Sequence, residues 1–444
     1  MARPVAMWQV ILLCWLGLVV MIAFGASVLR PPSTAWLRSG ILGLADVPDM
    51  IGRSFHRASA LPRPYAGGKL PRTPQGLVRN PAFTDPGYLL LTAFDEGLKR
   101  PVVRLMRLSD GAIVRQYAPD IAAINRQSRF TSALIDLRRD RNVTLNLMMH
   151  PLLMPDGGLV IHDSSPLARV DACGHVAWAI DGIFHHSVER DATGNIWASF
   201  RLPHAQVPDV GPQFNDEGFM EVSPAGKQLF VARIADVLDA NGLGYLWRSH
   251  PYTDDPFHLN DVQPILSTGP YWQKGDLLLS LRNVSTILLY RPSTGKVLWS
   301  KTGPWAMQHD VSVVDDHRIS VFDNHWRIAA PEGEVDGTNR VAVYDFKTGA
   351  TTFPMDKVMT ALDIDTRAQG RATPLPGGDF MIEETERGRV LRAAPDGTVR
   401  WTYTSATPDG KRLQLRWSRY LDPAETLDAI TQTKGVTCPT TLKP

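Results

Sequence analysis

The chain has 444 residues, of which 44% are hydrophobic and 21% are charged, and its formal net charge at pH 7 is +2. This composition is that of a globular protein and excludes an intrinsically disordered one. Because the net charge is close to zero, nothing in it favours a nucleic-acid partner, and we expect none.

An apolar run without Asp, Glu, Lys or Arg extends over residues 7–29, "MWQVILLCWLGLVVMIAFGASVL". Roughly 20 such residues suffice for a helix to cross a bilayer. We therefore predict that residues 1–30 form an uncleaved signal anchor with a transmembrane helix. A cleaved signal peptide, with Ala23 and Gly25 before the cut, is the alternative. Either interpretation places most of the chain outside the cytoplasm.

The segment 31–74 is rich in Pro, Gly, Arg and Ser, which predicts a juxtamembrane linker. A self-similar pattern follows over residues 75–421, and residues 422–444 form a C-terminal tail. The repeating unit is four short strand-like runs joined by glycine turns. The clearest copies are residues 150–180, 274–303 and 371–403, and weaker copies are residues 87–117, 194–234 and 317–353. Six four-stranded units predict an all-β fold, a six-bladed β-propeller.

Histidines recur at the beginning of the first strand of these units. The residues at this position are His150, His186, His258 and His309, with Arg371 in the last unit. His185 and His186 point to opposite faces of a strand, and we assign His186 to the channel because His185 would begin the strand one residue early. Since first strands line the central channel of a propeller, we expect these side chains to converge there.

Such a cluster has a definite chemistry. Neutral imidazole is a nucleophile, and a protonated neighbour stabilises negative charge or donates a proton. Arg282 ends the second strand of the His258 unit, where its guanidinium can bind two oxygens of a sulfate or phosphate group. Asn260, two residues after His258, is expected to donate a hydrogen bond to ester oxygens.

Three stretches occur in an order that resembles the bacterial arylsulfate sulfotransferase family: "DPFHLNDVQPI", "GDLLLSLRNVSTILLYRPSTGKVLW" and "MQHDVSVVDDHRISVFDN". "HHSVERDATGNIW" is similar to a further blade start of that family. The resemblance covers roughly residues 145–405. It implies a six-bladed propeller that transfers a sulfuryl group from a phenolic sulfate ester to a phenol, without a nucleotide donor and without a cofactor.

The resemblance also implies roles for individual residues. His309 would be the nucleophile that is transiently sulfated, and His186, His258 and Arg282 would assist it. Asn260, His150 and Arg371 are the expected substrate-binding residues. The expected partners are an aryl sulfate donor, a phenol or glycan acceptor, and the membrane through the N-terminal helix. The expected location is the bacterial inner membrane, crossed once, with the propeller in the periplasm.

Other interpretations remain open. The channel can hold an anionic ligand, such as a sulfated or carboxylated glycan, without turnover. "STGKVLWS" (residues 293–300) resembles the tryptophan docking motif of quinoprotein dehydrogenases, although only one clean copy is present. The three channel histidines with Asp261 or Asp310 can ligate a divalent ion, but their spacing matches no recognised metal motif, and we predict no metal site. Cys173 and Cys438 can pair or stay free.

Overall fold

The computed structural model describes residues 7–29, 44, 75–129, 135–211, 213–329, 333–433, 436 and 438. The chain divides into two compact units, Met1–Arg63 and Pro64–Pro444. The first unit contains helix α1 (Met7–Leu29), within the apolar run of the sequence. Among the described residues, no helix is long and apolar enough to cross a membrane, so the predicted transmembrane span is not supported. Except for Leu44, the predicted linker 31–74 lies outside the described residues.

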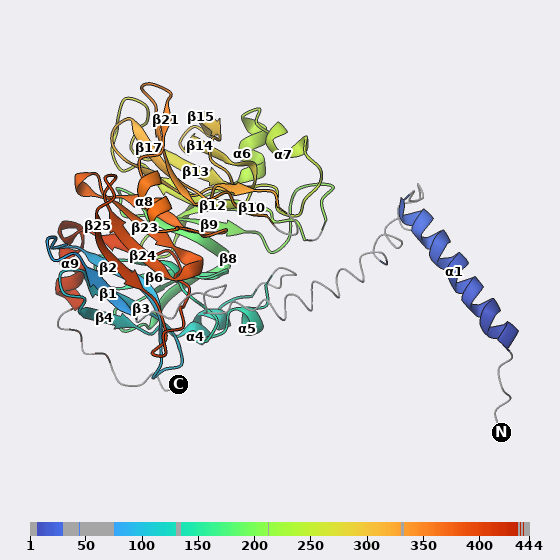
Figure 1. The fold of residues 1–444 in the computed structure, drawn as a ribbon, viewed down its shortest axis with the longest axis horizontal. Helices are drawn as coiled ribbons and strands as arrows, with labels where there is room; N and C mark the ends of the chain where they lie inside the picture. The colour runs from blue at the N-terminus through green and yellow to red at the C-terminus, as the bar shows by residue number, and fades with distance from the viewer. Residues whose placement is uncertain are drawn as a thin grey trace. The chain divides into compact units, whose positions relative to one another are not determined.

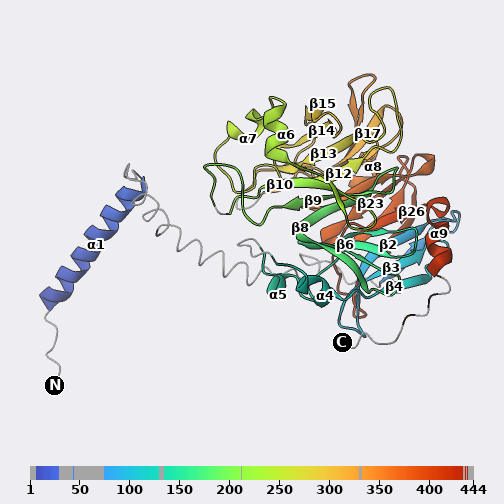
Figure 2. The same ribbon diagram turned by 180° about the vertical axis from the view of Figure 1, so that it is seen from behind.

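The second unit is an all-β, propeller-like fold, whose sheets are seen in Figures 1 and 2. Four of its sheets have four or five antiparallel strands and form single blades. In sheet order, the first has β26 (Arg419–Leu421), β2 (Tyr88–Asp95), β3 (Arg100–Arg107) and β4 (Ile113–Tyr117); the second has β12 (Leu259–Pro264), β13 (Leu277–Leu281), β14 (Thr286–Arg291) and β15 (Lys296–Thr302); the third has β16 (His309–Val313), β17 (Arg318–Asp323), β20 (Arg340–Asp345) and β21 (Thr351–Thr352); the fourth has β1 (Gly76–Arg79), β25 (Val399–Thr404), β24 (Arg389–Ala393), β23 (Phe380–Glu384) and β22 (Arg371–Pro374).

A fifth sheet has seven strands, and it corrects the prediction of six separate four-stranded sheets. Its strands are β5 (Met149–Leu153), β6 (Leu159–His162), β7 (Ser165–Val170), β8 (Val176–Arg190), β9 (Ile196–Arg201), β10 (Glu217–Val222) and β11 (Gln228–Arg233). Strand β8 runs unbroken through two repeats, because it pairs with β7 through its first half and with β9 through its second half. Hydrogen bonding therefore joins what the sequence pattern separates.

Short elements connect and cover the sheets. A small hairpin, β18 (Trp326–Arg327) and β19 (Glu334–Val335), interrupts the third sheet between β17 and β20. The helices of this unit are α4 (Ile121–Arg126), α5 (Leu137–Asp140), α6 (Ile234–Ala240), α7 (Tyr245–Arg248), α8 (Asp356–Ala361) and α9 (Pro423–Thr433). Helices α4 to α7 fall where the sequence breaks between strand repeats.

The core lies between neighbouring sheets. The described residues form six hydrophobic clusters, and each joins strands of two adjacent four-stranded groups. One cluster packs Leu167 of β7 against Phe184, Ile196 and Met220, so the two halves of the seven-stranded sheet face each other as separate sheets do. At roughly 25 cal/mol per Å² of apolar surface, this packing is the main source of stability.

The two ends of the propeller chain meet in one sheet. Strand β26, near the C-terminus, pairs antiparallel with β2, and Leu421 lies opposite Tyr88. Helix α9 lies beside this sheet (Figure 2), where Ala429 and Ile430 pack against the cluster that contains Leu90. The C-terminal strand thus covers an edge of β2 that would otherwise be unpaired.

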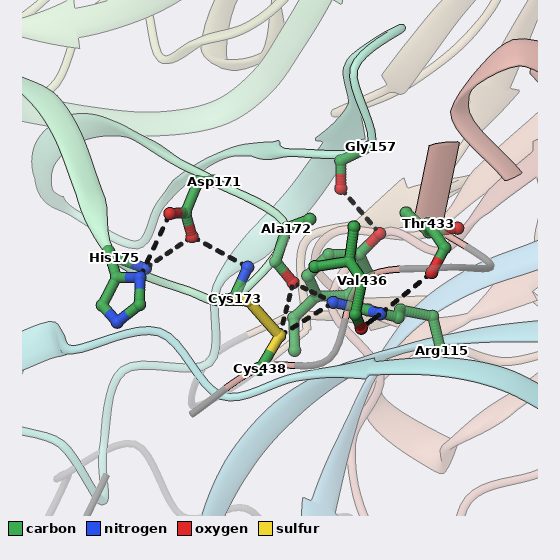
Figure 3. The surroundings of a disulfide bond; sticks show 10 residues. Arg115, Gly157, Asp171, Ala172, Cys173, His175, Thr433, Val436 and Cys438 are labelled. Carbon is green, nitrogen blue, oxygen red and sulfur yellow. Dashed lines mark hydrogen bonds and ion pairs between the residues drawn. A yellow bond between two sulfur atoms is a disulfide. The ribbon is translucent and has the colours of Figure 1, made fainter. Parts of the chain in front are cut away.

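A disulfide fastens the tail that follows α9 (Figure 3). Cys173 and Cys438 are bonded, with their Cα atoms 5.3 Å apart, which settles a pairing that the sequence left open. The Arg115 guanidinium donates hydrogen bonds to the carbonyl oxygens of Thr433 (3.2 Å), Val436 (3.1 Å) and Ala172 (2.6 Å). Arg115 and the disulfide therefore hold the end of the chain against the turn that carries Cys173.

Breaking this bond should destabilise the propeller. We expect Cys438→Ser to lower the free energy of unfolding by about 2–5 kcal/mol, because the cross-link closes a loop of 265 residues and restricts the unfolded chain. Thermal unfolding followed by circular dichroism measures the effect. The control is Cys14→Ser, since Cys14 is exposed and unpaired. Equal melting temperatures for the wild type and Cys438→Ser would contradict the expectation.

Candidate active site

The first strands of four repeats each carry a β-bulge at an equivalent point. Register shifts fall between Met149 and Leu152, between His185 and Val188, between Leu259 and Asp261, and between His309 and Val311. The backbone is left-handed at His150 (φ +50°), His186 (φ +59°) and His258 (φ +53°). A bulge redirects side chains, and left-handed non-glycine residues, which cost about 1–3 kcal/mol each, cluster at functional sites. The common position of the histidines therefore has a common structural cause.

Three of the predicted catalytic residues converge. The ring centroid of His186 lies 5.0 Å from that of His258 and 5.9 Å from that of His309, and the last two are 6.4 Å apart. One ring nitrogen from each lies within 4.8 Å of the others. Trp417 borders the group, with its centroid 5.9 Å from His186 and 6.2 Å from His309. We call His186, His258 and His309 the histidine trio.

His309 is held in one tautomer. Its Nδ1 lies 2.7 Å from Asn324 Oδ1, and the Asn324 amide nitrogen donates to the carbonyl oxygens of Thr366 (3.0 Å) and Gln369 (2.9 Å). The amide oxygen of Asn324 therefore faces the ring, so Nδ1 carries the proton and Nε2 carries the lone pair. Nε2 accepts the Gln369 backbone N–H at 3.2 Å. Burial, and then the charge of Arg282, lower the pKa of His309 well below its usual value, which keeps the ring neutral.

His258 has an ionised partner. Its Nδ1 lies 2.6 Å from Asp255 Oδ2. Burial opposes ionisation of Asp255, but the charge of His258 and this hydrogen bond outweigh it and lower the pKa of the carboxyl. Asp255 therefore directs the Nε2 edge of His258 away from itself and stabilises an imidazolium at this position.

Arg282 stands beside the trio with unused hydrogen-bonding capacity. Its backbone N–H donates to the His258 carbonyl oxygen (3.1 Å), and one terminal nitrogen donates to Asn283 Oδ1 (2.7 Å). Its Nε is buried without a hydrogen-bond partner in the structure. Burial lowers the pKa of Arg282, but a guanidinium stays charged at neutral pH. A desolvated cation with a free donor is suited to an anionic group.

The other two residues of the predicted set, His150 and Arg371, form a separate group. The Arg371 guanidinium forms an ion pair with Asp310 (2.9 Å) and a hydrogen bond with His150 Nε2, and it lies 3.8 Å from Glu189. His150 reaches the trio only through Trp417, whose ring centroid is 5.4 Å from its own. The expected convergence of all four histidines and Arg371 on one point is therefore incomplete, because carboxylates occupy Arg371.

Asn260 occupies the bulge of β12 and is fully buried. Its amide nitrogen donates to the Gln308 carbonyl oxygen (2.7 Å), and its Oδ1 has no hydrogen-bond partner in the structure. The bulge removes Asn260 from the simple two-residue alternation on which its predicted position depended. One amide N–H remains for a ligand, so its role in substrate binding stays a prediction.

The acidic residues next to the histidines hold neighbouring blades together. Ser187 Oγ accepts the Val262 N–H, and Asp261 Oδ2 accepts the Val311 N–H, both at 2.8 Å. In the same way Asp310 Oδ2 accepts the Ala372 N–H at 2.8 Å. Each first strand thus binds the next through one side chain. Asp261 and Asp310 are committed to these bonds and to Arg371, and are poorly placed as metal ligands.

The trio itself has a geometry that can hold a metal ion. Nitrogen is a preferred ligand of Zn²⁺, and a second-shell partner on the other ring nitrogen is typical of metal-binding histidines. Each Nδ1 in the trio has such a partner: Asn324, Asp255 or His185. Glu217 and Asp255 form a second such group with His258. These groups show that a soft divalent cation fits where the sequence predicts no metal.

Several functional groups escaped the sequence analysis. Asn324 follows β17 where Arg282 follows β13, so the repeat phase that indicates Arg282 also indicates Asn324. The assignment of His186 rested on a strand that begins there, whereas β8 begins at Val176. Both His185 and His186 are buried, and their Nδ1 atoms are 2.8 Å apart. No periodic pattern could have indicated this contact, because the bulge after His185 creates it.

The fold and the site define a propeller with a channel site of neutral imidazoles and one desolvated arginine, suited to an oxyanionic group. The chain belongs to the arylsulfotransferase (ASST) family, whose model matches residues 151–406, more than half of the chain. This confirms the resemblance seen in the sequence motifs. No curated protein matches the chain.

Solved structures with similar folds share little sequence with this chain. One is a protein of unknown function from Bacteroides caccae (TM-score 0.45, 12% identity, 76% of this chain and 99% of that one). Another is hydrazine synthase of Kuenenia stuttgartiensis (0.44, 12%, 81% and 99%). A third is the WD40 domain of Neurospora crassa Pan2 (0.40, 11%, 80% and 96%).

Proposed function

We propose that this protein transfers a sulfuryl group from a phenolic sulfate ester to a phenol or another hydroxyl acceptor, through a sulfohistidine at His309. One observation carries the proposal: in a chain of the arylsulfotransferase family, the unprotonated Nε2 of a neutral, buried histidine stands beside a desolvated arginine. A nucleophile and a group that binds the anion are the two components that the reaction requires.

In the first half-reaction, His309 Nε2 attacks the ester sulfur. The S–N bond forms, the S–O bond to the phenol breaks, and the bonding electron pair leaves with the phenol oxygen. A histidine of the trio then supplies a proton to that oxygen, a contribution of about 10²–10⁴ in rate. Arg282 binds the sulfuryl oxygens. By analogy with phosphoryl transfer, catalysis is then mostly positioning and electrostatic stabilisation.

In the second half-reaction, the acceptor hydroxyl attacks the sulfur, and the S–N electron pair returns to His309 Nε2. The acceptor proton passes to the histidine that lost one in the first step. Asn324 keeps the Nδ1–H of His309 in place, so that the same nitrogen receives and releases the group. The Gln369 N–H, now on Nε2, is positioned to donate to a bound sulfuryl oxygen.

We further propose that the seven-stranded sheet acts as two blades, which makes a six-bladed propeller. The cluster between its two halves, with Leu167 facing Met220, supports this proposal, since it resembles the clusters between the other sheets. We also propose a periplasmic location for the propeller. The Cys173–Cys438 disulfide supports it, because such bonds persist in oxidising compartments.

The direct test is brief exposure of the full-length protein to 4-nitrophenyl sulfate, followed by peptide mass spectrometry at a pH that preserves phosphoramidate-like bonds. We expect release of 4-nitrophenol and a peptide with one sulfuryl group on His309. A phenol acceptor should remove the label. Release of phenol with the label on another residue would refute the role of His309.

One observation favours a second candidate, a channel that binds an anionic ligand without turnover. The lone pair of His309 Nε2 already accepts the Gln369 N–H, so the nucleophile is engaged in the ligand-free structure. Binding of an aryl sulfate, measured by calorimetry, with neither phenol release nor label would establish this alternative over the enzyme.

Zinc should inhibit the reaction. We expect Zn²⁺ to lower turnover of 4-nitrophenyl sulfate and EDTA to restore it, because the three nitrogens that surround the ester would then bind the metal. Mg²⁺ is the control, since it prefers oxygen ligands. Turnover that depends on added Zn²⁺, or is lost with EDTA alone, would contradict a mechanism carried by histidines and arginine without a metal.

A further inference from the structure

A chain of buried titratable groups leads away from the histidine trio. His186 Nδ1 lies 2.8 Å from His185 Nδ1, and on the other side of that ring His185 Nε2 lies 3.5 Å from Glu217 Oε1. All three residues are buried, and the second distance is that of an ion pair. His185 Nε2 has no closer partner in the structure. Contacts of this length in a ligand-free site often shorten when substrate binds.

Neither ring in the chain readily carries a charge. Burial lowers the pKa of both His185 and His186 well below the usual value, and neighbouring cations add to the effect. Burial, and then the charge of Asp255, raise the pKa of Glu217 to about 7. The carboxyl is thus the group of the three that changes protonation near neutral pH, while the two rings stay neutral.

We propose that Glu217, His185 and His186 form a proton relay that stores, on the Glu217 carboxyl, the proton exchanged between the phenol leaving group and the incoming acceptor. The proposal rests on the sulfuryl-transfer function above. His186 is the catalytic residue that faces the substrate, and His185 and Glu217 act through it.

The proton count is the same at both ends of the relay. In the loaded state Glu217 is protonated, His185 carries its proton on Nδ1, and His186 carries its proton on Nε2. When His186 Nε2 gives its proton to the phenol oxygen, the His185 Nδ1 proton moves to His186 Nδ1, and the Glu217 proton moves to His185 Nε2. The negative charge ends on Glu217, and both imidazoles are neutral before and after. Deprotonation of the acceptor reverses each transfer.

The surroundings of Glu217 suit a carboxyl that alternates between two states. Arg201 Nε donates to Glu217 Oε1 at 3.1 Å, and the Leu259 N–H donates to Oε2, so the ionised form is bound. Asp255 opposes ionisation from the segment before β12, where His258 favours it. Around His185 the other charged or titratable neighbours are His162 and Arg201, and around His186 they include His309. These opposing charges keep the two states of Glu217 close in energy.

The first test compares two substrates with Glu217→Gln. An amide cannot store the proton, so we expect turnover of phenyl sulfate, whose leaving group needs protonation, to fall at least about tenfold more than that of 4-nitrophenyl sulfate. The matched control is Glu221→Gln on the same strand; Glu221 accepts a hydrogen bond from Asn195 outside the site and should leave both rates unchanged. An equal fall for both substrates would indicate a structural role and overturn the relay.

The second test uses the unmodified full-length protein and does not depend on turnover. With ¹⁵N-labelled histidine, we expect His186 and His185 to exchange tautomers together as pH passes through about 7, without either ring becoming an imidazolium. Fixed tautomers across this range, or an imidazolium at either ring, would overturn the relay. If the tautomers exchange but no sulfuryl label appears on His309, the proposed function fails while the coupled proton chain stands.

Discussion

His309→Ala is expected to abolish sulfuryl transfer. Without the imidazole, no atom of this side chain can accept the sulfuryl group, and loss of a covalent nucleophile costs roughly 10³-fold or more in kcat. Both the release of 4-nitrophenol and the sulfated peptide should disappear. The fold should survive, because alanine leaves the bulge of β16 and its inter-blade bond through Asp310 in place.

A control distinguishes the nucleophile from a general loss of histidine. His175 is exposed on a turn, where its Nδ1 lies 3.1 Å from Asp171, and His175→Ala should retain wild-type turnover. Added imidazole should restore part of the activity of His309→Ala, since it can enter the space that the ring leaves. Turnover of His309→Ala close to that of the wild type would exclude His309 as the sulfuryl carrier.

Arg282→Gln is expected to reduce kcat by about 10²–10³, the usual cost of removing one donor from a transition-state oxyanion. The substitution removes the only guanidinium that the structure places beside the trio with a buried, unpartnered Nε, within the described residues. KM should rise as well, since the donor ester is also anionic. Steady-state kinetics with 4-nitrophenyl sulfate measures both parameters.

The same variant should change the pH profile. The charge of Arg282 disfavours an imidazolium at His309 and so lowers its pKa. A lower pKa keeps Nε2 unprotonated, and therefore nucleophilic, down to more acidic pH. Removal of Arg282 should move the acidic limb of kcat/KM to higher pH, although burial of His309 persists. Arg291→Gln is the matched control, because Arg291 pairs with Asp276 away from the trio.

Part of the site was predictable because a propeller repeats. His186, His258 and His309 occupy one phase of the repeat, and the structure places their rings within 6.4 Å of one another. The same logic fails for His150, which has the phase but not the surroundings. Its blade neighbours supply Arg371 and Glu189, and it joins their charge network instead. Sequence phase gives the height of a side chain in the channel, but not the partners across it.

The number of sheets shows a similar limit. Turn glycines and strand-like runs indicate where each repeat begins and ends, and the four sheets of four or five strands agree with them. Continuity of β8 depends instead on hydrogen bonds to β7 and β9 across a register shift. The addition of β1 to β25 and of β26 to β2 likewise requires pairing between distant segments. Local composition contains no signal for such pairing.

The amino-acid sequence alone determined the all-β repeat, the family, and the residues that supply a nucleophile and a cation, since these depend on local pattern and side-chain chemistry. The tertiary structure decided which groups meet: Asn324 with His309, Asp255 with His258, and Glu217 with His186 through His185. The tautomers, the pKa directions and the Cys173–Cys438 bond follow from those contacts. The physical reason is that burial and electrostatic coupling arise only when segments far apart in the chain share one desolvated space.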